Sequence, residues 1–420
     1  MRRMLAAFLV PFALSSLMLA GPAMAKPPLA AWVEMTGSGA QVRAVADGEA
    51  CPRLMVDGRA HRMSLRAGPD EAFVNRVCQA SLPAGVSRAS VGGQALPVAK
   101  ARPRRLVILG DTGCRLKGPY VQNCNDPVAG WPFARVAALA AAQKPDLVIH
   151  VGDYYYRETA CPAGIAICAG SPFGDRWPTW KAELFDPAAG LLKAAPWVFA
   201  RGNHEDCKRG GRGWFRLLDA DFRVQACPAG HSATFTVPIG GARLAILDTA
   251  DGDDIKVDPA LVATLQADLK AIPAGPTPLW LVTHRPIWAV NRKGDALADG
   301  ITNANERAAV KAQGLGQVEL ALVGHIHNFT SLDFGPGRPG ELVVGTGGDI
   351  QDPSDLPPPA VAKVVIDGMT ADVFTMGRFG YFVFDRQGKG DDWAGVFHDL
   401  TDAVIAKCAL RGGRLGCVGV

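Results

Sequence analysis

Short apolar runs alternate with helix-like stretches along most of the chain after residue 105. The uninterrupted apolar runs predict strands covered on both faces, at residues 106–109, 147–151, 198–200, 244–247, 279–282 and 320–323. Between them, apolar residues recur at helical spacing and predict helices at residues 133–143, 181–193, 259–272 and 305–313. Strands that alternate with helices in this way indicate an α/β core.

Strand-rich regions flank this core on both sides. Short alternating runs separated by Gly, Pro and Asp predict N-terminal strands at residues 32–35, 41–46, 53–56 and 76–80. Near the C-terminus, similar pieces predict antiparallel strands that complete the core, at residues 342–344, 363–366, 381–384 and 393–397. The basic stretch at 99–105 has the composition of a linker. We therefore expect a small β-rich domain at residues 26–100 and a second domain at residues 101–420.

Composition excludes several classes of protein. With 48% hydrophobic and 20% charged residues, and Gly and Pro at no fixed period, the chain is neither disordered nor fibrous. The only long apolar run lies at the N-terminus, which excludes a polytopic membrane protein. A net charge of +4, without a basic stripe that contains aromatic residues, indicates no nucleic-acid-binding surface.

The first 25 residues have the pattern of a secretory signal peptide. Arg2 and Arg3 precede an apolar run at 4–20, and the Ala-Met-Ala sequence at 23–25 is a small-x-small cleavage site. The alternative is an uncleaved membrane anchor. We expect cleavage, a periplasmic or secreted protein, and no stable membrane insertion afterwards.

The cysteine content agrees with export. An even number of cysteines in an exported chain indicates disulfide bonds, whereas the tight C-x2-C spacing of zinc fingers is absent from the sequence. Pairing each cysteine with its neighbour in sequence would give five bridges. The candidates are Cys51 with Cys78, Cys114 with Cys124, Cys161 with Cys168, Cys207 with Cys227, and Cys408 with Cys417.

Polar clusters follow five of the six predicted core strands. They read GDTG at 110–113, GDYYYRE at 152–158, RGNHE at 201–205, THRP at 283–286 and GHIH at 324–327. Each alone could be an ordinary turn, because Gly permits positive φ and Asp accepts hydrogen bonds from backbone amides. In open α/β sheets, however, ligands bind beyond the carboxyl ends of the strands. The five clusters together therefore predict one metal-binding crevice.

This ordered set of motifs resembles the calcineurin-like metallophosphoesterases, and within them the purple acid phosphatases. The resemblance extends over residues 106–348 and implies a central β-sandwich flanked by helices. Two residues point to the purple acid phosphatase branch. Gly113 stands where many relatives carry a His ligand, and Tyr156 supplies a phenol three residues after Asp153. The alternative for Tyr156 is a packing aromatic.

The resemblance also implies a binuclear centre with one shared carboxylate, Asp153. Asp111, Tyr156 and His327 would hold the first metal, and Asn203, His284 and His325 the second. A carboxylate and a phenolate suit Fe3+, whereas two imidazoles and an amide oxygen suit a divalent ion such as Zn2+, Fe2+ or Mn2+. We expect disulfides that follow three of the motifs to brace the metal-bearing loops.

The implied reaction is hydrolysis of small-molecule phosphomonoesters by attack of a metal-bound hydroxide. His204 would donate a proton to the leaving oxygen, or clamp the phosphoryl group, and Glu205 would orient its neighbours. Arg201 and Arg285 would contact phosphate or form structural ion pairs. The alternative activities are those of a phosphodiesterase, a nucleotidase or a pyrophosphatase. A non-catalytic, metal-bearing binding protein is a third hypothesis.

Overall fold

The computed structural model describes residues 27–420, except 225–226, 228–229, 295, 301–302, 353–360 and 389. The predicted signal peptide lies outside the described residues. Among the helices that are described, none combines the length and the apolar character needed to cross a membrane.

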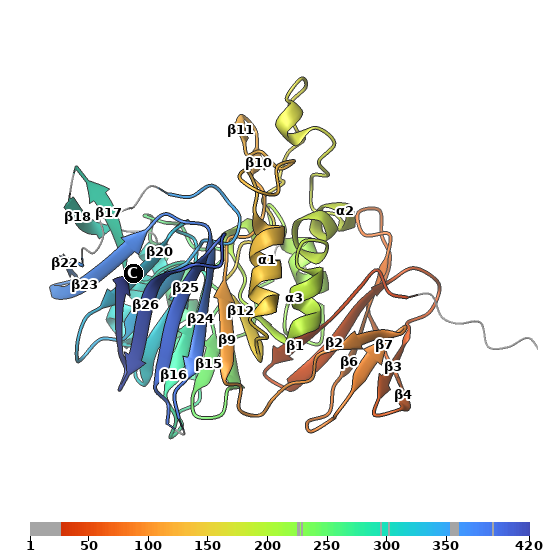
Figure 1. The fold of residues 1–420 in the computed structure, drawn as a ribbon, viewed down its shortest axis with the longest axis horizontal. Helices are drawn as coiled ribbons and strands as arrows, with labels where there is room; N and C mark the ends of the chain where they lie inside the picture. Colours follow the sequence, from red (N-terminus) through yellow and green to blue (C-terminus); the bar gives the residue numbers. More distant parts are fainter. Residues whose placement is uncertain are drawn as a thin grey trace, which may run out of the picture.

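Two large sheets pack face to face in the centre of the molecule (Figure 1). The 11-stranded sheet contains the parallel strands β9 (Arg105–Leu109), β12 (Leu147–His150) and β13 (Trp197–Phe199). The 8-stranded sheet contains the parallel strands β15 (Arg243–Ile246), β16 (Leu279–Val282), β19 (Val318–Val323) and β21 (Gly340–Val344). Ile108 and Ile149 of the first sheet share one buried apolar cluster with Trp280 and Leu322 of the second. This apolar layer joins the sheets into a sandwich.

Helices cover the outer face of each sheet. On the 11-stranded sheet, α1 (Phe133–Ala142) and α3 (Ala189–Ala194) bury their apolar residues against the strands. On the 8-stranded sheet, α5 (Pro259–Ala271) and α6 (Ala304–Gln313) do the same. Asp258 begins α5 by accepting a 2.9 Å hydrogen bond from the Ala260 N–H, as expected at a helix N-terminus. The predicted β-sandwich flanked by helices is confirmed.

One predicted helix is broken in the structure. Residues 181–193 were expected to form a continuous helix, but α2 (Trp177–Trp180) runs into a π-helical turn, Lys181–Phe185, and α3 begins only at Ala189. Pro187 explains the break, since it lacks an N–H and disfavours helical geometry at the residue before it. A further short helix, α4 (Gly211–Leu217), follows β13.

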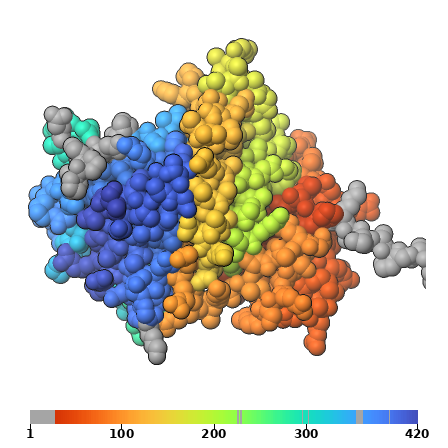
Figure 2. Space-filling view, in the orientation of Figure 1, coloured from red at the N-terminus to blue at the C-terminus, as the bar shows by residue number. Residues whose placement is uncertain are grey.

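The N-terminal strands extend the 11-stranded sheet. Strand β1 (Ala30–Thr36) pairs in parallel with β13, with Glu34 opposite Trp197. The sheet continues through β2 (Gly39–Ala46), β6 (Arg76–Ser81) and β5 (Ser64–Ala67). A 4-stranded sheet adds β4 (Arg59–Arg62), β3 (Arg53–Val56), β7 (Ala89–Val91) and β8 (Gln94–Leu96). Figure 2 shows the N-terminal region, in red and orange, continuous with the rest of the surface. The sequence boundary near residue 100 thus divides two regions that share one sheet.

The C-terminal strands complete both sheets, as predicted. Strand β24 (Gly380–Arg386) pairs antiparallel with β9 and is followed by β25 (Trp393–Asp399), β26 (Val404–Arg411) and β27 (Arg414–Gly419). The 8-stranded sheet gains β20 (Phe329–Asp333), β22 (Ala362–Ile366) and β23 (Met369–Met376), and β14 (Phe235–Pro238), from earlier in the chain, forms its other edge. Strand β21 meets the antiparallel expectation with β20 but pairs in parallel with β19 on its other side.

Two small hairpins and five disulfides complete the fold. The hairpins are β10 (Leu116–Lys117) with β11 (Tyr120–Val121), and β17 (Ala289–Lys293) with β18 (Ala296–Gly300). Every cysteine pairs with its neighbour in sequence, as expected: Cys51–Cys78, Cys114–Cys124, Cys161–Cys168, Cys207–Cys227 and Cys408–Cys417.

Candidate metal centre

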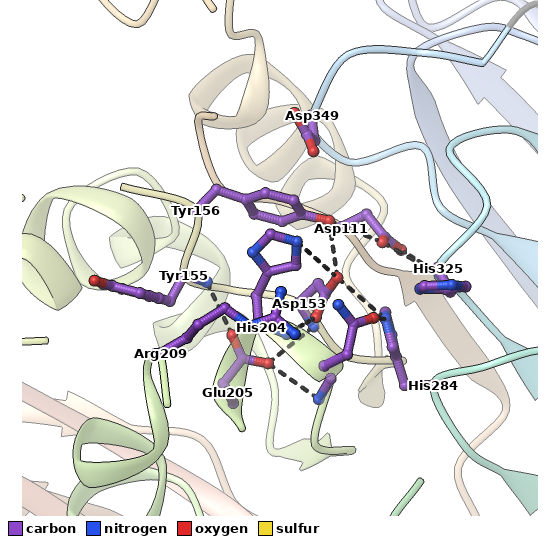
Figure 3. A network of polar contacts seen from close by, with 12 residues as sticks. Asp111, Asp153, Tyr155, Tyr156, His204, Glu205, Arg209, His284, His325 and Asp349 are labelled. Carbon is purple, nitrogen blue, oxygen red and sulfur yellow. Dashed lines mark hydrogen bonds and ion pairs between the residues drawn. The ribbon is translucent and has the colours of Figure 1, made fainter. Parts of the chain in front are cut away.

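Loops at the carboxyl ends of strands from both sheets converge on one site. Strands β9, β12 and β13 of the first sheet lead into the loops that carry Asp111, Asp153 and Asn203. Strands β16 and β19 of the second sheet lead into the loops that carry His284 and His325. Figure 3 shows the side chains of Asp111, Asp153, His284 and His325 gathered at one place. The predicted crevice therefore lies at the junction of the two sheets.

Around the Tyr156 phenol, the donor atoms predicted for the first metal lie close together. The phenol oxygen is 2.9 Å from Asp153 Oδ2, 3.1 Å from Asp111 Oδ1 and 3.0 Å from His327 Nε2. All four side chains are buried, with Tyr156 and Asp111 completely shielded from solvent. The tyrosine that the sequence singled out thus contacts each of the other three predicted donors.

The donor atoms predicted for the second metal gather around His284. Its Nε2 is 3.1 Å from Asp153 Oδ2 and 3.1 Å from Asn203 Oδ1. His325 lies within the same cluster, since nitrogen or oxygen atoms of Asp153, His284 and His325 are all within 4.8 Å of one another. Asp153 Oδ2 is therefore the atom that neighbours both groups of donors.

These distances fit a binuclear centre. Around a metal with bonds of about 2.1 Å, adjacent donor atoms of an octahedron lie about 3.0 Å apart. The contacts of Tyr156 and His284 match this spacing. The two groups also differ in chemistry, because the first contains the phenol and a second carboxylate, whereas the second has imidazoles and an amide. The residues present can hold one hard and one borderline cation.

The buried acidic groups at the site would repel one another if all were ionised. Burial, followed by the charges of Asp153 and Asp111, raises the pKa of the Tyr156 phenol well above its ordinary value. Burial would also raise the pKa of Asp153, but His284 and His204 hold it well below its usual range. A cation among these oxygen atoms would lower their pKa values, because bound metals favour the deprotonated form of the groups that coordinate them.

The backbone is strained at three of the predicted ligands. Asp111, Asp153 and His325 have φ values of 55°, 59° and 70°, in the left-handed region that non-glycine residues rarely adopt. Such conformations cost of order 1–3 kcal/mol each and persist where surrounding contacts impose them. The contacts that hold these loops are therefore part of the site.

Two glycines make room for the predicted ligands. A Cβ at Gly113 would lie 2.5 Å from Tyr156 Cδ2, so the phenol occupies the space that a side chain at position 113 would need. A Cβ at Gly202 would collide with the Asp153 carboxylate and backbone nitrogen. The position of the Tyr156 ring thus requires a glycine at 113.

Glu205 holds two of the loops through backbone amides. Its Oε1 accepts hydrogen bonds from the N–H groups of Tyr154 (2.8 Å) and Tyr155 (2.9 Å). Its Oε2 accepts from Asp153 (3.1 Å) and Gly202 (3.0 Å). Burial and then the Asp153 charge raise the pKa of Glu205 to about 8. The orienting role expected for Glu205 corresponds to these four contacts.

Glu183 performs a similar function from the π-helical turn. Its carboxylate accepts hydrogen bonds from the N–H groups of Cys114 (2.8 Å) and Tyr156 (2.6 Å) and lies 3.4 Å from Arg157 Nε. It therefore fixes the GDTG loop relative to the tyrosine loop. π-Helical turns occur frequently at functional sites, and here the turn directs a buried carboxylate toward backbone amides.

His204 lies beside the predicted ligands without joining them. Its ring stacks on the Tyr156 ring, with centroids 3.9 Å apart, and its Nε2 is 4.0 Å from Asp153 Oδ2. Its Nδ1 is 2.8 Å from Glu158 Oε1. Glu158 thus orients the imidazole so that the other nitrogen faces the centre.

The arginines occupy different environments. Arg201 is buried and pairs with Asp248, with Nη1 and Oδ2 3.0 Å apart, so it forms a structural ion pair and does not line the cleft. Arg285 lies near the site and contacts Asp254 and His325 Nε2. Arg115, to which the sequence assigned no role, lines the cleft and is held by Asp349.

A cleft of about 360 Å3 opens onto the predicted ligands. It is lined by Arg115, Tyr120, Asp153, Asn203, His204, His325, His327, Ile350 and Asp352. A larger cavity of about 720 Å3 lies beside Trp288, Arg307 and Arg338 and contains none of the predicted ligands. The predicted ligands therefore face the smaller cleft.

Comparison with known proteins identifies the family. The model of the calcineurin-like phosphoesterase family matches residues 104–329, more than half of the chain. The chain belongs to the calcineurin-like phosphoesterase family. Purple acid phosphatase 23 of Arabidopsis thaliana is 23% identical over 304 residues, which cover 67% of this chain and 61% of that protein. The match thus spans less than two thirds of this plant relative.

Two solved structures share the phosphoesterase fold. Purple acid phosphatase PPD1 from yellow lupin (Lupinus luteus) seeds superimposes with a TM-score of 0.55 at 12% identity, covering 94% of this chain and 74% of that one. PhoD superimposes with a TM-score of 0.56 at 12% identity, covering 95% and 94%. At this identity the similarity establishes the fold. Both superpositions cover more of the chain than the region matched by the family model.

Several supporting residues of the site were not predicted from the sequence. Asp349 follows β21 in a Gly-Gly-Asp sequence, which resembles the clusters after the other strands and could have been noticed. Glu158 belongs to the GDYYYRE motif but was given no role. Glu183 has no local signal, because its partners are backbone amides far away in sequence.

Proposed function

We propose that this phosphoesterase is a binuclear metal phosphatase that hydrolyses phosphomonoesters. The observation that supports it most directly is the position of Asp153 Oδ2, which is 2.9 Å from the Tyr156 phenol oxygen and 3.1 Å from His284 Nε2. One carboxylate oxygen that neighbours two separate groups of donors is what a pair of bridged cations requires. The likeness to purple acid phosphatases in sequence and fold supports the same activity.

The proposed cofactors are Fe3+ held by Asp111, Tyr156 and His327, and a divalent ion held by Asn203, His284 and His325, with Asp153 shared. Zn2+, Fe2+ and Mn2+ each suit the second group. Two metals about 3.5–4 Å apart can activate water, neutralise phosphoryl oxygens and hold an in-line geometry.

The chain's own groups supply the acid and a positive charge near the substrate. During hydrolysis, the ester P–O bond breaks as the oxygen of water bonds to phosphorus, and the leaving oxygen takes a proton. His204 is the proposed donor, since its Nε2 faces the centre while Glu158 holds Nδ1. Arg115, at the wall of the cleft, is the proposed phosphate contact, in place of the buried Arg201.

We also propose that the protein acts after export, in the periplasm or outside the cell. The predicted signal peptide and the pairing of all ten cysteines support this location, because disulfides persist in oxidising compartments.

Metal analysis combined with a substrate panel tests the proposed function. The purified protein should contain two metals per chain, including iron, and should be coloured through a Tyr156–Fe3+ contact. It should hydrolyse an aryl monoester faster than a bis-aryl diester. A fully loaded protein that prefers the diester would reject the monoesterase assignment, and a colourless iron-loaded, active protein would reject Tyr156 as a ligand.

A further inference from the structure

The mouth of the metal cleft carries two exposed apolar side chains that the proposed chemistry does not use. Tyr120 is 68% exposed and Ile350 is 47% exposed, and both line the same cleft as Asp153 and His204. The deeper walls of this cleft are polar, formed by the predicted ligands and Arg115. A substrate whose phosphoryl group occupies the polar end would therefore extend its organic part toward these two side chains.

Tyr120 is presented by a hairpin that is anchored in the metal site itself. Leu116 of β10 donates a backbone hydrogen bond to the Tyr156 carbonyl (3.0 Å), and its own carbonyl accepts one from Thr159 (3.0 Å). The Cys114–Cys124 disulfide closes the base of the hairpin. Figure 1 shows β10 and β11 projecting past the end of α1. The position of Tyr120 is thus fixed relative to the Tyr156 loop.

Strand pairing shows which way the Tyr120 side chain faces. Tyr120 is directly opposite Lys117 in the hairpin, and residues paired in this way lie on the same face of a sheet. Lys117 Nζ reaches to 3.8 Å from Glu158 Oε2, the carboxylate that holds His204. The face of the hairpin that carries Tyr120 is therefore turned toward the proposed proton donor, where the leaving group departs.

Ile350 is held in place from another side of the cleft. Its carbonyl oxygen is 2.8 Å from His327 Nδ1, which ties it to a predicted ligand. Asp352, two residues on, lines the cleft as well, as does Arg115. The mouth therefore offers an aromatic ring and a branched aliphatic side chain beside charges of both signs.

We propose that Tyr120 and Ile350 form a subsite for the leaving group, and that this subsite selects phosphomonoesters of aromatic alcohols. The inference rests on the proposed phosphatase function and adds its substrate class. An aromatic ring of the substrate would stack on Tyr120 and contact Ile350, whereas a short alkyl group would reach neither.

The test compares an aromatic ligand with a small alkyl ligand in matched variants. Phenyl phosphate and methyl phosphate serve as substrates for metal-loaded enzyme, and phenylphosphonate and methylphosphonate serve as non-hydrolysable ligands in calorimetry. Comparing variant with wild type for each compound cancels the intrinsic difference in leaving-group reactivity.

Tyr120→Ala should weaken phenylphosphonate binding and lower kcat/KM for phenyl phosphate by about 3- to 10-fold, the range expected for loss of one aromatic contact. The methyl compounds should change by less than about 2-fold. Tyr120→Phe should retain the preference, because the ring remains. Val128→Ala, at a residue that is 59% exposed and outside the cleft, is the matched control and should alter neither series.

Equal losses for phenyl and methyl compounds in Tyr120→Ala, or no loss for either, would overturn the subsite. A different pattern marks failure of the proposed function. If wild-type enzyme loaded with metal hydrolyses neither ester, the phosphatase assignment is lost and the subsite with it.

Discussion

Replacing Glu205 with Gln tests whether backbone amides fix the metal-bearing loops. The carboxylate uses one oxygen for Tyr154 and Tyr155 and the other for Asp153 and Gly202. A glutamine has a single acceptor oxygen, so in either orientation its NH2 group faces two backbone N–H donors. The change is isosteric, yet it leaves two buried donors without an acceptor.

The expected cost follows from those two donors. An unsatisfied buried polar group costs about 1–3 kcal/mol, so Glu205→Gln should lower the free energy of unfolding by about 2–6 kcal/mol. A typical domain is stable by only about 5–15 kcal/mol, which makes this loss large. Loosening of the loops should also weaken metal affinity by about 10- to 100-fold, as for other groups that orient ligands.

The measurement uses denaturant unfolding of metal-loaded protein together with metal retention during dialysis against a chelator. Metal-loaded protein is required because burial and then the Asp153 charge raise the pKa of Glu205. A cation bound to Asp153 offsets that charge and so favours the ionised Glu205 that accepts all four hydrogen bonds. Glu71→Gln makes the same chemical change at an exposed position and should shift stability by no more than about 0.5 kcal/mol. If Glu205→Gln matches this control in both measurements, the four amide contacts do not hold the loops.

Three further predictions concern other parts of the site and its surroundings. Gly113→Ala should displace Tyr156 and remove any colour due to a phenolate–iron contact, because the new Cβ would lie 2.5 Å from Cδ2; an unchanged absorption spectrum would contradict this. His204→Ala should keep both metals by elemental analysis but slow turnover by about 10²–10⁴-fold, and unchanged turnover would remove it from the mechanism. His231 has a raised pKa, chiefly through its hydrogen bond with Asp268, so its stabilising effect is complete below its ordinary pKa of 6.5 and is lost as the pH rises through the higher folded value. The difference in Tm between wild type and His231→Gln should thus be larger near about pH 5.5 than near about pH 9, and a constant difference would refute it.

The core of the fold and the side chains predicted as ligands could be read from the sequence because both signals are local. Apolar runs marked β9, β12, β16 and β19, and the polar residues directly after them lie together in the structure. A strand followed at once by Gly-Asp or Gly-His contains in a few residues both the element and the group that it positions. Such patterns need no knowledge of distant contacts.

What the sequence did not reveal depends on partners far along the chain. The N-terminal strands had the right pattern, but nothing local indicates that Glu34 lies opposite Trp197 in a shared sheet. Glu183 was placed inside a predicted helix, whereas its function depends on amides of the Cys114 and Tyr156 loops. Arg201 sits in a ligand motif, yet its burial against Asp248 is visible only in three dimensions.

The pairing of β9 with β24 bears on the order in which parts of the chain can form their contacts. Ile108 lies opposite Phe382, so the strand that leads to Asp111 gains this neighbour only after nearly all residues have been synthesised. The disulfides, by contrast, join cysteines only 7 to 27 residues apart. The four disulfides that end by Cys227 can therefore form while the polypeptide is still emerging, whereas Cys408–Cys417 lies beyond β24. The strand that positions Asp111 in the predicted metal centre is completed on this side only once β24 is available.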